Sequence, residues 1–72
     1  MTPEKFCQIG AALRGPNWKT AVAADIERHV REVQYYATGQ RPIQRREELK
    51  LAHCLRTQAA TLIAYANEIE GG

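Results

Sequence analysis

This chain of 72 residues has four side chains of the types that often act in catalysis or metal binding: Cys7, Cys54, His29 and His53. The cysteines are far apart in sequence, and they form neither a CxxC pair nor a cluster with histidines at metal-ligand spacing. No HExxH motif or glycine-rich phosphate loop is present. Isolated cysteines in a chain that is 44% hydrophobic are usually reduced core residues, and a disulfide or a metal site is the minority alternative. We therefore expect no enzyme, no metal or other cofactor and no small-molecule substrate.

Basic side chains are the other distinctive group, and they are concentrated in the middle of the chain. The whole chain has ten Lys and Arg against eight Asp and Glu, a net charge of +2. Residues 28–56 hold seven bases and three acids and carry +4, so the remaining residues carry −2. A locally positive segment favours contact with phosphate, whereas the modest total argues against a protein that coats nucleic acid.

The length predicts a single domain, residues 1–72, with a modest core. A core of this size gives marginal stability, so we expect a partner. The chain does not open with a charged stretch followed by an apolar run, and it has no run of about 18 apolar residues. These features predict a soluble, cytoplasmic protein without a membrane-spanning segment.

The elements that must position these side chains begin with a helix from Thr2 to about Arg14. Thr2 suits the cap, Pro3 suits the first helical position, and Gly15-Pro16 ends the helix. Asn17 is the next expected cap, and a second helix follows it. The inward positions of the two helices are Phe6, Ile9, Leu13, Trp18, Ala21, Val22 and Ile26.

A long helix is expected over residues 44–70, which contain neither glycine nor proline. At about 1.5 Å per residue it would be about 40 Å long, so its second half should project beyond so small a domain. Its apolar positions step by three and four and form a heptad seam, which predicts a homodimer. The expected dimer interface is Leu55, Ala59, Leu62, Ala66 and Ile69. The alternative is a break near Thr57-Gln58 that folds two shorter helices onto one monomer.

The segment from Trp18 to Ala37 decides the function, and its local pattern permits two structures. Val22, Ile26, Val30, Val33 and Ala37 have the spacing of one straight helix, which would make the protein a plain helical bundle. The other structure has a turn at residues 27–29 followed by a recognition helix at about residues 29–38.

The wider pattern favours the turn. The segment NWKTAVAADIERHVREVQYYATGQRPI, residues 17–43, resembles without gaps the helix-turn-helix of small phage-type, Cro-like repressors and related bacterial regulators. In that family the pattern W-x-x-A-L-A-x-x-L-G-V-S-x-x-T-V-x-x-W-x-x-G-x-R-P-I is common. The matching residues are Trp18, Ala21, Val22, Ala23, Ile26, Val33, Tyr36, Gly39, Arg41, Pro42 and Ile43. The resemblance implies an all-α domain of four to five helices, with a helix-turn-helix core over residues 1–43 and a long C-terminal helix for dimerisation.

The turn itself departs from the family. The family's glycine is Glu27 here, its next apolar residue is Arg28, and its capping Ser or Thr is His29. Glutamate in a left-handed conformation costs about 1 kcal/mol relative to glycine, and histidine is a poorer cap than serine. The turn is therefore not encoded by its own residues and needs support from a packed core.

The resemblance places the second helix in the major groove, where residues near its amino end meet base edges. The expected base-reading residues are Val30, Arg31, Glu32, Gln34 and Tyr35. Arg31 can bond guanine, Gln34 can pair with adenine, and Val30 can touch a thymine methyl. Glu32 either accepts from cytosine or pairs with Arg28 one turn earlier. The expected phosphate contacts are Asn17, Trp18, Lys19, Gln40, Arg41, Arg45 and Arg46. An ordinary solvated surface is the alternative for each residue.

Two functions from different classes follow. The first is a transcriptional regulator of the repressor type, which binds a short palindrome in double-stranded DNA as a homodimer. The second is a small all-helical adaptor or inhibitor, similar to a phage inhibitor or an antitoxin, that binds a protein partner and does not read DNA.

Overall fold

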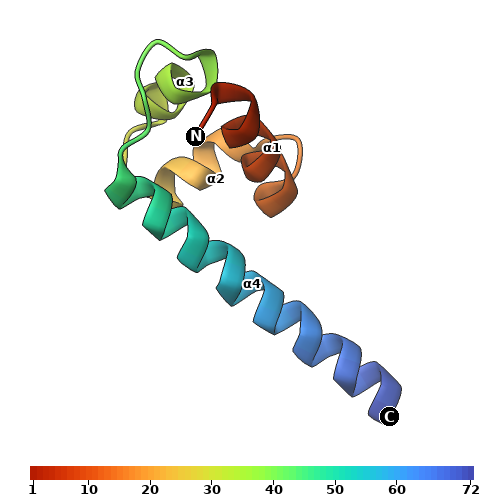
Figure 1. Cartoon of the computed structure of the whole chain (residues 1–72). Coiled ribbons are helices and arrows are strands. Elements are labelled where there is room, and N and C mark those ends of the chain that lie inside the picture. The colour runs from red at the N-terminus through yellow and green to blue at the C-terminus, as the bar shows by residue number, and fades with distance from the viewer.

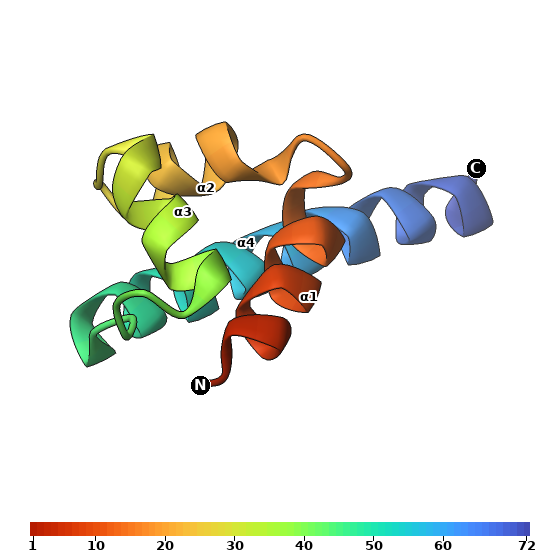
Figure 2. The ribbon, with the colours of Figure 1, turned by 90° about the horizontal axis from the view of Figure 1, so that it is seen from above.

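The computed structural model describes all 72 residues. They form four helices joined by short connections, and there is no strand. They are α1 (Pro3–Arg14), α2 (Trp18–Asp25), α3 (Val30–Thr38) and α4 (Arg45–Gly71). Helices α1 to α3 gather around the first half of α4, and the second half projects away from them (Figures 1 and 2). The molecule measures 48 × 23 × 19 Å along its principal axes. The predicted all-α fold with a long C-terminal helix is confirmed, and the alternative of a break near Thr57-Gln58 is wrong.

The ends of the first two helices follow from local residues. The N–H of Lys5 donates to the Thr2 hydroxyl at 3.1 Å, and Pro3 occupies the first helical position. Asn17 precedes α2, but its side chain makes no capping hydrogen bond. A bidentate ion pair with a shortest distance of 2.6 Å joins Arg14, at the end of α1, to Asp25, at the end of α2.

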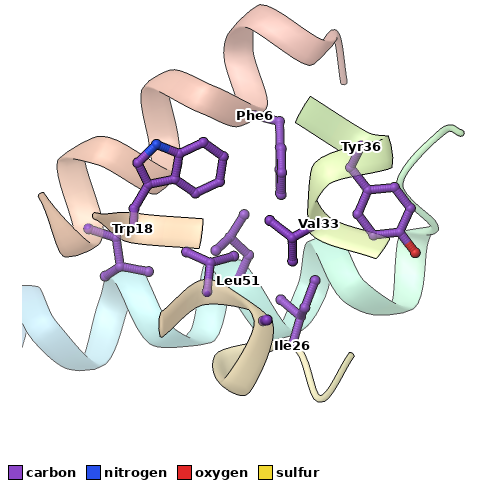
Figure 3. Packing of buried hydrophobic residues seen from close by; sticks show 9 residues of the cluster. Phe6, Trp18, Ile26, Val33, Tyr36 and Leu51 are labelled. Carbon is purple, nitrogen blue, oxygen red and sulfur yellow. The ribbon is translucent and has the colours of Figure 1, made fainter. Parts of the chain in front are cut away.

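The core is an aromatic cluster between α1, α2 and α3 that rests on α4 (Figure 3). Phe6 contacts Trp18 and Tyr36 edge-on, with ring centroids 5.4 and 5.9 Å apart. Trp18 lies directly against Gly10, where an added Cβ would come within 2.3 Å of the indole. The buried hydrophobic residues are Phe6, Leu13, Trp18, Val22, Ala23, Ile26, Val33, Tyr36 and Leu51.

The first half of α4 belongs to this core. Leu51 is buried in the cluster and Leu55 packs partly against it. Residues 1–43 therefore do not complete the core alone, because α1, α2 and α3 close their apolar faces on the first half of α4. None of the four helices combines the length and the apolar character needed to cross a bilayer.

Candidate nucleic-acid interface

The turn between α2 and α3 is formed, so the straight helix from Trp18 to Ala37 is wrong. Helix α2 ends at Asp25, and Glu27 adopts a left-handed conformation with φ of 58°, the one positive φ at a residue other than glycine. The N–H of Arg28 donates to the carbonyl of Ala23 at 2.9 Å, and that of Glu27 donates to Ala24 at 3.2 Å. This is the Schellman closure of a helix, with glutamate in the place that glycine usually takes.

His29 starts the next helix. Its backbone is extended, with φ of −68° and ψ of 148°, and its Nδ1 accepts a hydrogen bond from the N–H of Arg31 at 3.1 Å. The imidazole thus satisfies one of the free amides of α3, the task that serine or threonine performs in most caps. Gly39 ends α3 in the left-handed conformation.

Two ion pairs of opposite polarity attach the turn to α4. Lys50 Nζ lies 2.8 Å from Glu27 Oε2, and Arg28 Nε lies 3.2 Å from Glu47 Oε1. The two turn residues Glu27 and Arg28 therefore each contact α4. The turn depends on this tertiary contact, because its own residues do not favour it.

Glu47 is the buried centre of this arrangement, with 1% of its surface exposed. Its Oε1 also accepts a hydrogen bond from the Tyr36 hydroxyl at 2.8 Å. Burial opposes ionisation of Glu47, but the hydrogen bonds from Tyr36 and from its own backbone N–H, together with the charge of Arg28, lower its pKa. Burial and the bond to Glu47 raise the pKa of Tyr36, which therefore stays a donor. Glu47 thus joins α3, the turn and α4.

Helix α3 keeps one face in the core and leaves the other uncovered. Val33 and Tyr36 are buried, as expected, whereas Arg31 and Gln34 are exposed. Val30 and Tyr35 are half-buried. Arg31 and Gln34 are the second and fifth residues of α3, so they lie on its first two turns. This is the part of a recognition helix that meets base edges.

Arg41 brings together two expected base-reading residues. Its Nη1 donates to both carboxylate oxygens of Glu32 at 3.1 Å, and its guanidinium carbon lies 4.6 Å from the centroid of the Tyr35 ring. Of the two alternatives for Glu32, the pairing with Arg28 is wrong. Those two residues would be neighbours in one straight helix, but the turn places Arg28 outside α3, next to Glu47.

The expected phosphate contacts are dispersed around the helix-turn-helix. Asn17, Lys19, Gln40, Arg45 and Arg46 are exposed. The Trp18 ring is a core residue, so only its backbone amide, at the start of α2, could meet a phosphate.

The cations differ in whether an acid neutralises them. Arg45 pairs with Glu48 at 3.3 Å, and Arg41 is engaged by Glu32. The cationic side chains that take part in no ion pair are Lys5, Lys19, Arg31, Arg46 and Arg56, and the acids without one are Glu4, Glu68 and Glu70. Apart from Lys5 on α1, the unpaired positive charges therefore lie on α2, α3 and the first half of α4, whereas two of the three unpaired acids lie near the far end of α4.

The sequence did not identify Glu47 or Lys50 as supports of the turn. Glu47 lies in the charged run RREE, which resembles an exposed helix face. Its spacing to Leu51 and Leu55, at four and eight positions, is the signal that places it on the inward face. Cys7 and Cys54 are free and half-buried, and neither lies in the α2–α3 segment.

The chain matches no family model, no curated protein and no solved structure. What the site can do chemically thus rests on its own geometry: a short capped helix with one uncovered face, preceded by a turn that is ion-paired to α4 and bordered by unpaired cations.

Proposed function

We propose that this chain is a sequence-specific DNA-binding regulator, of the repressor type, whose α3 enters the major groove. The observation that carries the proposal is the α2–turn–α3 unit, in which Glu27 is left-handed and the outer face of α3 is uncovered. An uncovered short helix that packs on the helix before it is the geometry with which helix-turn-helix proteins reach base edges.

Base reading is assigned to the first two turns of α3. Arg31 is exposed and unpaired, so it is free to donate two hydrogen bonds to O6 and N7 of a guanine. Gln34 is exposed one turn later and can pair with adenine, and Val30 offers a methyl contact to thymine. Glu32 and Tyr35 contribute differently, because Arg41 already engages both of them.

Phosphate contacts are assigned to the flanks of α3. Lys19, near the start of α2, and Arg46, in the first turn of α4, carry charges that no acid in the chain neutralises. Arg41 removes the repulsion that the Glu32 carboxylate would exert on a phosphate. Gln40 and the amides at the start of α2 add uncharged donors.

A homodimer joined through α4 would carry two such units to the half-sites of a short palindrome. Successive major grooves on one face of the duplex lie about 34 Å apart, so the pairing of α4 sets the operator spacing. Binding by such a dimer would be regulated through concentration, degradation or a partner protein.

A protein-binding adaptor or inhibitor is the second candidate. It is favoured by the Glu32–Arg41–Tyr35 cluster, which uses two of the five expected base-reading residues within the chain. An interface of this kind would be anchored by Tyr35 and Arg41, the residue types that most often dominate protein–protein binding.

Salt dependence separates the two candidates. Binding to a labelled duplex of mixed sequence is measured by fluorescence anisotropy from about 50 to 200 mM salt, the range over which phosphate contacts weaken steeply. The regulator should lose affinity in proportion to its phosphate contacts, and Arg46→Ala should flatten the dependence. A folded protein that does not bind duplex DNA at the lowest salt would contradict the proposal.

A further inference from the structure

The second half of α4 carries large apolar side chains that nothing in the chain covers. Leu62, Ile63, Tyr65 and Ile69 are 57%, 61%, 58% and 81% exposed. This part of α4 projects from the rest of the molecule, as the blue end of the ribbon in Figure 1 shows. So many large apolar side chains on one exposed segment of two to three turns mark an interaction surface.

The seam along this segment alternates between small and large residues. Ala59 and Ala66 occupy one of the two heptad positions, and Leu62 and Ile69 occupy the other. Leu55, one turn earlier, is already half-buried against the chain's own core, so the uncovered seam begins at Ala59.

This alternation favours an antiparallel pair of helices. In a parallel, in-register pair, identical positions meet, so layers of two alanines would alternate with layers of two large residues. The large layers would hold the helices apart, and the alanine layers would leave voids. In an antiparallel pair, Ala59 lies opposite Ile69 of the second copy, and Leu62 lies opposite its Ala66. Every layer then contains one small and one large residue.

Charge complementarity supports the same arrangement. Arg56 and Glu70 flank the seam, are exposed, and take part in no ion pair within the chain. They lie about 21 Å apart along one helix, at about 1.5 Å per residue. In the antiparallel register, Arg56 of each copy lies beside Glu70 of the other, which gives two symmetric pairs. In a parallel pair, both Glu70 side chains would lie together at the negative ends of two helix dipoles.

The two remaining exposed apolar residues fit this register. Ile63 and Tyr65 flank the seam on opposite sides. Both lie close to its midpoint, which is at the level of Ala64 along the helix. Around a twofold axis at Ala64, Ile63 faces Ile63 of the second copy, and Tyr65 faces its Tyr65. All four large exposed side chains of the segment would thus be covered together.

We propose that two copies of this chain associate through residues 56–70 of α4 in an antiparallel pair, with Arg56 bonded to Glu70 of the second copy. The proposal specifies how the two chains of the proposed regulator pair. It rests on the proposed function only in giving this dimer a role on DNA. It places the helix-turn-helix units at opposite ends of the pair. The Lys50 positions of the two helices would lie about 42 Å apart along the axis, at about 1.5 Å per residue.

Charge reversal tests the pairing, with the dimer dissociation constant measured by sedimentation equilibrium in the absence of DNA. Arg56→Glu and Glu70→Arg should each weaken the dimer by roughly tenfold, since each replaces two attractive contacts with repulsive ones. The double variant should recover most of the affinity. Glu68→Arg is the matched control: it makes the same charge change on the same turn but outside the seam, and should leave the dimer unchanged. A chain that stays monomeric at millimolar concentration, or a double variant as weak as the single ones, would overturn the proposal.

Disulfide trapping tests the direction of the helices. In a background with Cys7 and Cys54 changed to serine, Ala59→Cys and Ile69→Cys chains are mixed and oxidised. The antiparallel pair predicts a crosslink between the two different chains, whereas self-crosslinking of each variant would establish a parallel pair and overturn the proposal. An antiparallel dimer that binds no DNA would contradict only the proposed function. Specific DNA binding by a parallel dimer or a monomer would contradict only this inference.

Discussion

Lys50 Nζ on α4 lies 2.8 Å from the carboxylate of Glu27, the residue whose left-handed backbone makes the turn between α2 and α3. A side chain at this position disfavours the left-handed backbone, but the side chain of Glu27 also attaches the turn to α4. The neighbouring pair, Arg28 with Glu47, repeats the connection with the charges reversed. Both contacts join residues about 20 positions apart, so the turn is fixed by the tertiary fold.

Substitution of Glu27 separates backbone strain from the ion pair. Glu27→Gly and Glu27→Ala both lose Lys50, but only glycine adopts a positive φ without steric cost. We expect the glycine variant to melt roughly 5 °C above the alanine variant, measured by circular dichroism. Equal melting temperatures would show that the turn relaxes and that Glu27 is not held in the left-handed conformation.

His29 should behave as a replaceable cap. His29→Ala removes the acceptor for the N–H of Arg31 and should lower the free energy of unfolding by about 1 kcal/mol in urea titrations. His29→Ser and His29→Asp retain an acceptor and should be at least as stable as the original chain. If alanine proves as stable as serine at this position, the capping role is wrong.

Glu47 gives the unfolding free energy a dependence on acid pH. The pKa of Glu47 is lowered in the folded chain, because its hydrogen bonds and Arg28 outweigh its burial. Because this pKa is lower in the folded chain than in the unfolded one, the ionised carboxylate stabilises the fold. The stabilisation is complete at a pH above the pKa of the unfolded residue, about 4.3, and it is lost as the pH falls through the pKa of the folded chain. Glu47→Gln keeps an acceptor for Tyr36 but loses the charge. It should cost about 2 kcal/mol at pH 7, and the difference should shrink below pH 4.

Glu48→Gln is the matched control for that series. Glu48 is adjacent on α4 and also pairs with cations, Arg45 and the amino terminus, but these pairs are more exposed and therefore weaker. Unfolding should be followed in urea from pH 3 to pH 7. A Glu47→Gln variant that runs parallel to the original chain over this range would contradict the account of the buried pair.

Most of the fold was predictable because its signals are local. Thr2-Pro3 starts α1, Gly15-Pro16 ends it, Gly39 ends α3, and the absence of glycine and proline predicts the length of α4. These residues act through their own backbone preferences, which do not depend on the rest of the chain.

The turn and its surroundings were harder to predict because they depend on long-range contacts. The apolar spacing from Val22 to Ala37 fits a straight helix equally well, and only the wider resemblance favoured the turn. One of the two alternatives for Glu32, the pairing with Arg28, fails for the same reason, since Arg28 is its neighbour only in an unbroken helix. Leu55, expected in the dimer seam, also packs partly against the monomer core, because it lies on the first half of α4.

Arg31 and Arg46 should affect DNA binding in different ways. Arg31→Ala should relax the preference at one base pair by about 1–3 kcal/mol, because it removes a bidentate contact to a base edge. Arg46→Ala should weaken binding to all sequences alike and reduce the slope of log affinity against log salt by about one. Anisotropy titrations on a set of single-base variants of the best site measure both. Unchanged selectivity in Arg31→Ala would refute the assignment of α3 as the recognition helix.

Selection of bound fragments from a random duplex pool measures whether the uncovered face of α3 reads DNA sequence. The folded protein is incubated with the pool near physiological salt, and the bound fragments are sequenced. We expect an enriched inverted repeat, with a preference at one position that disappears in Arg31→Ala. If folded protein at micromolar concentration enriches no motif, α3 does not read DNA, and the protein-binding adaptor becomes the better account.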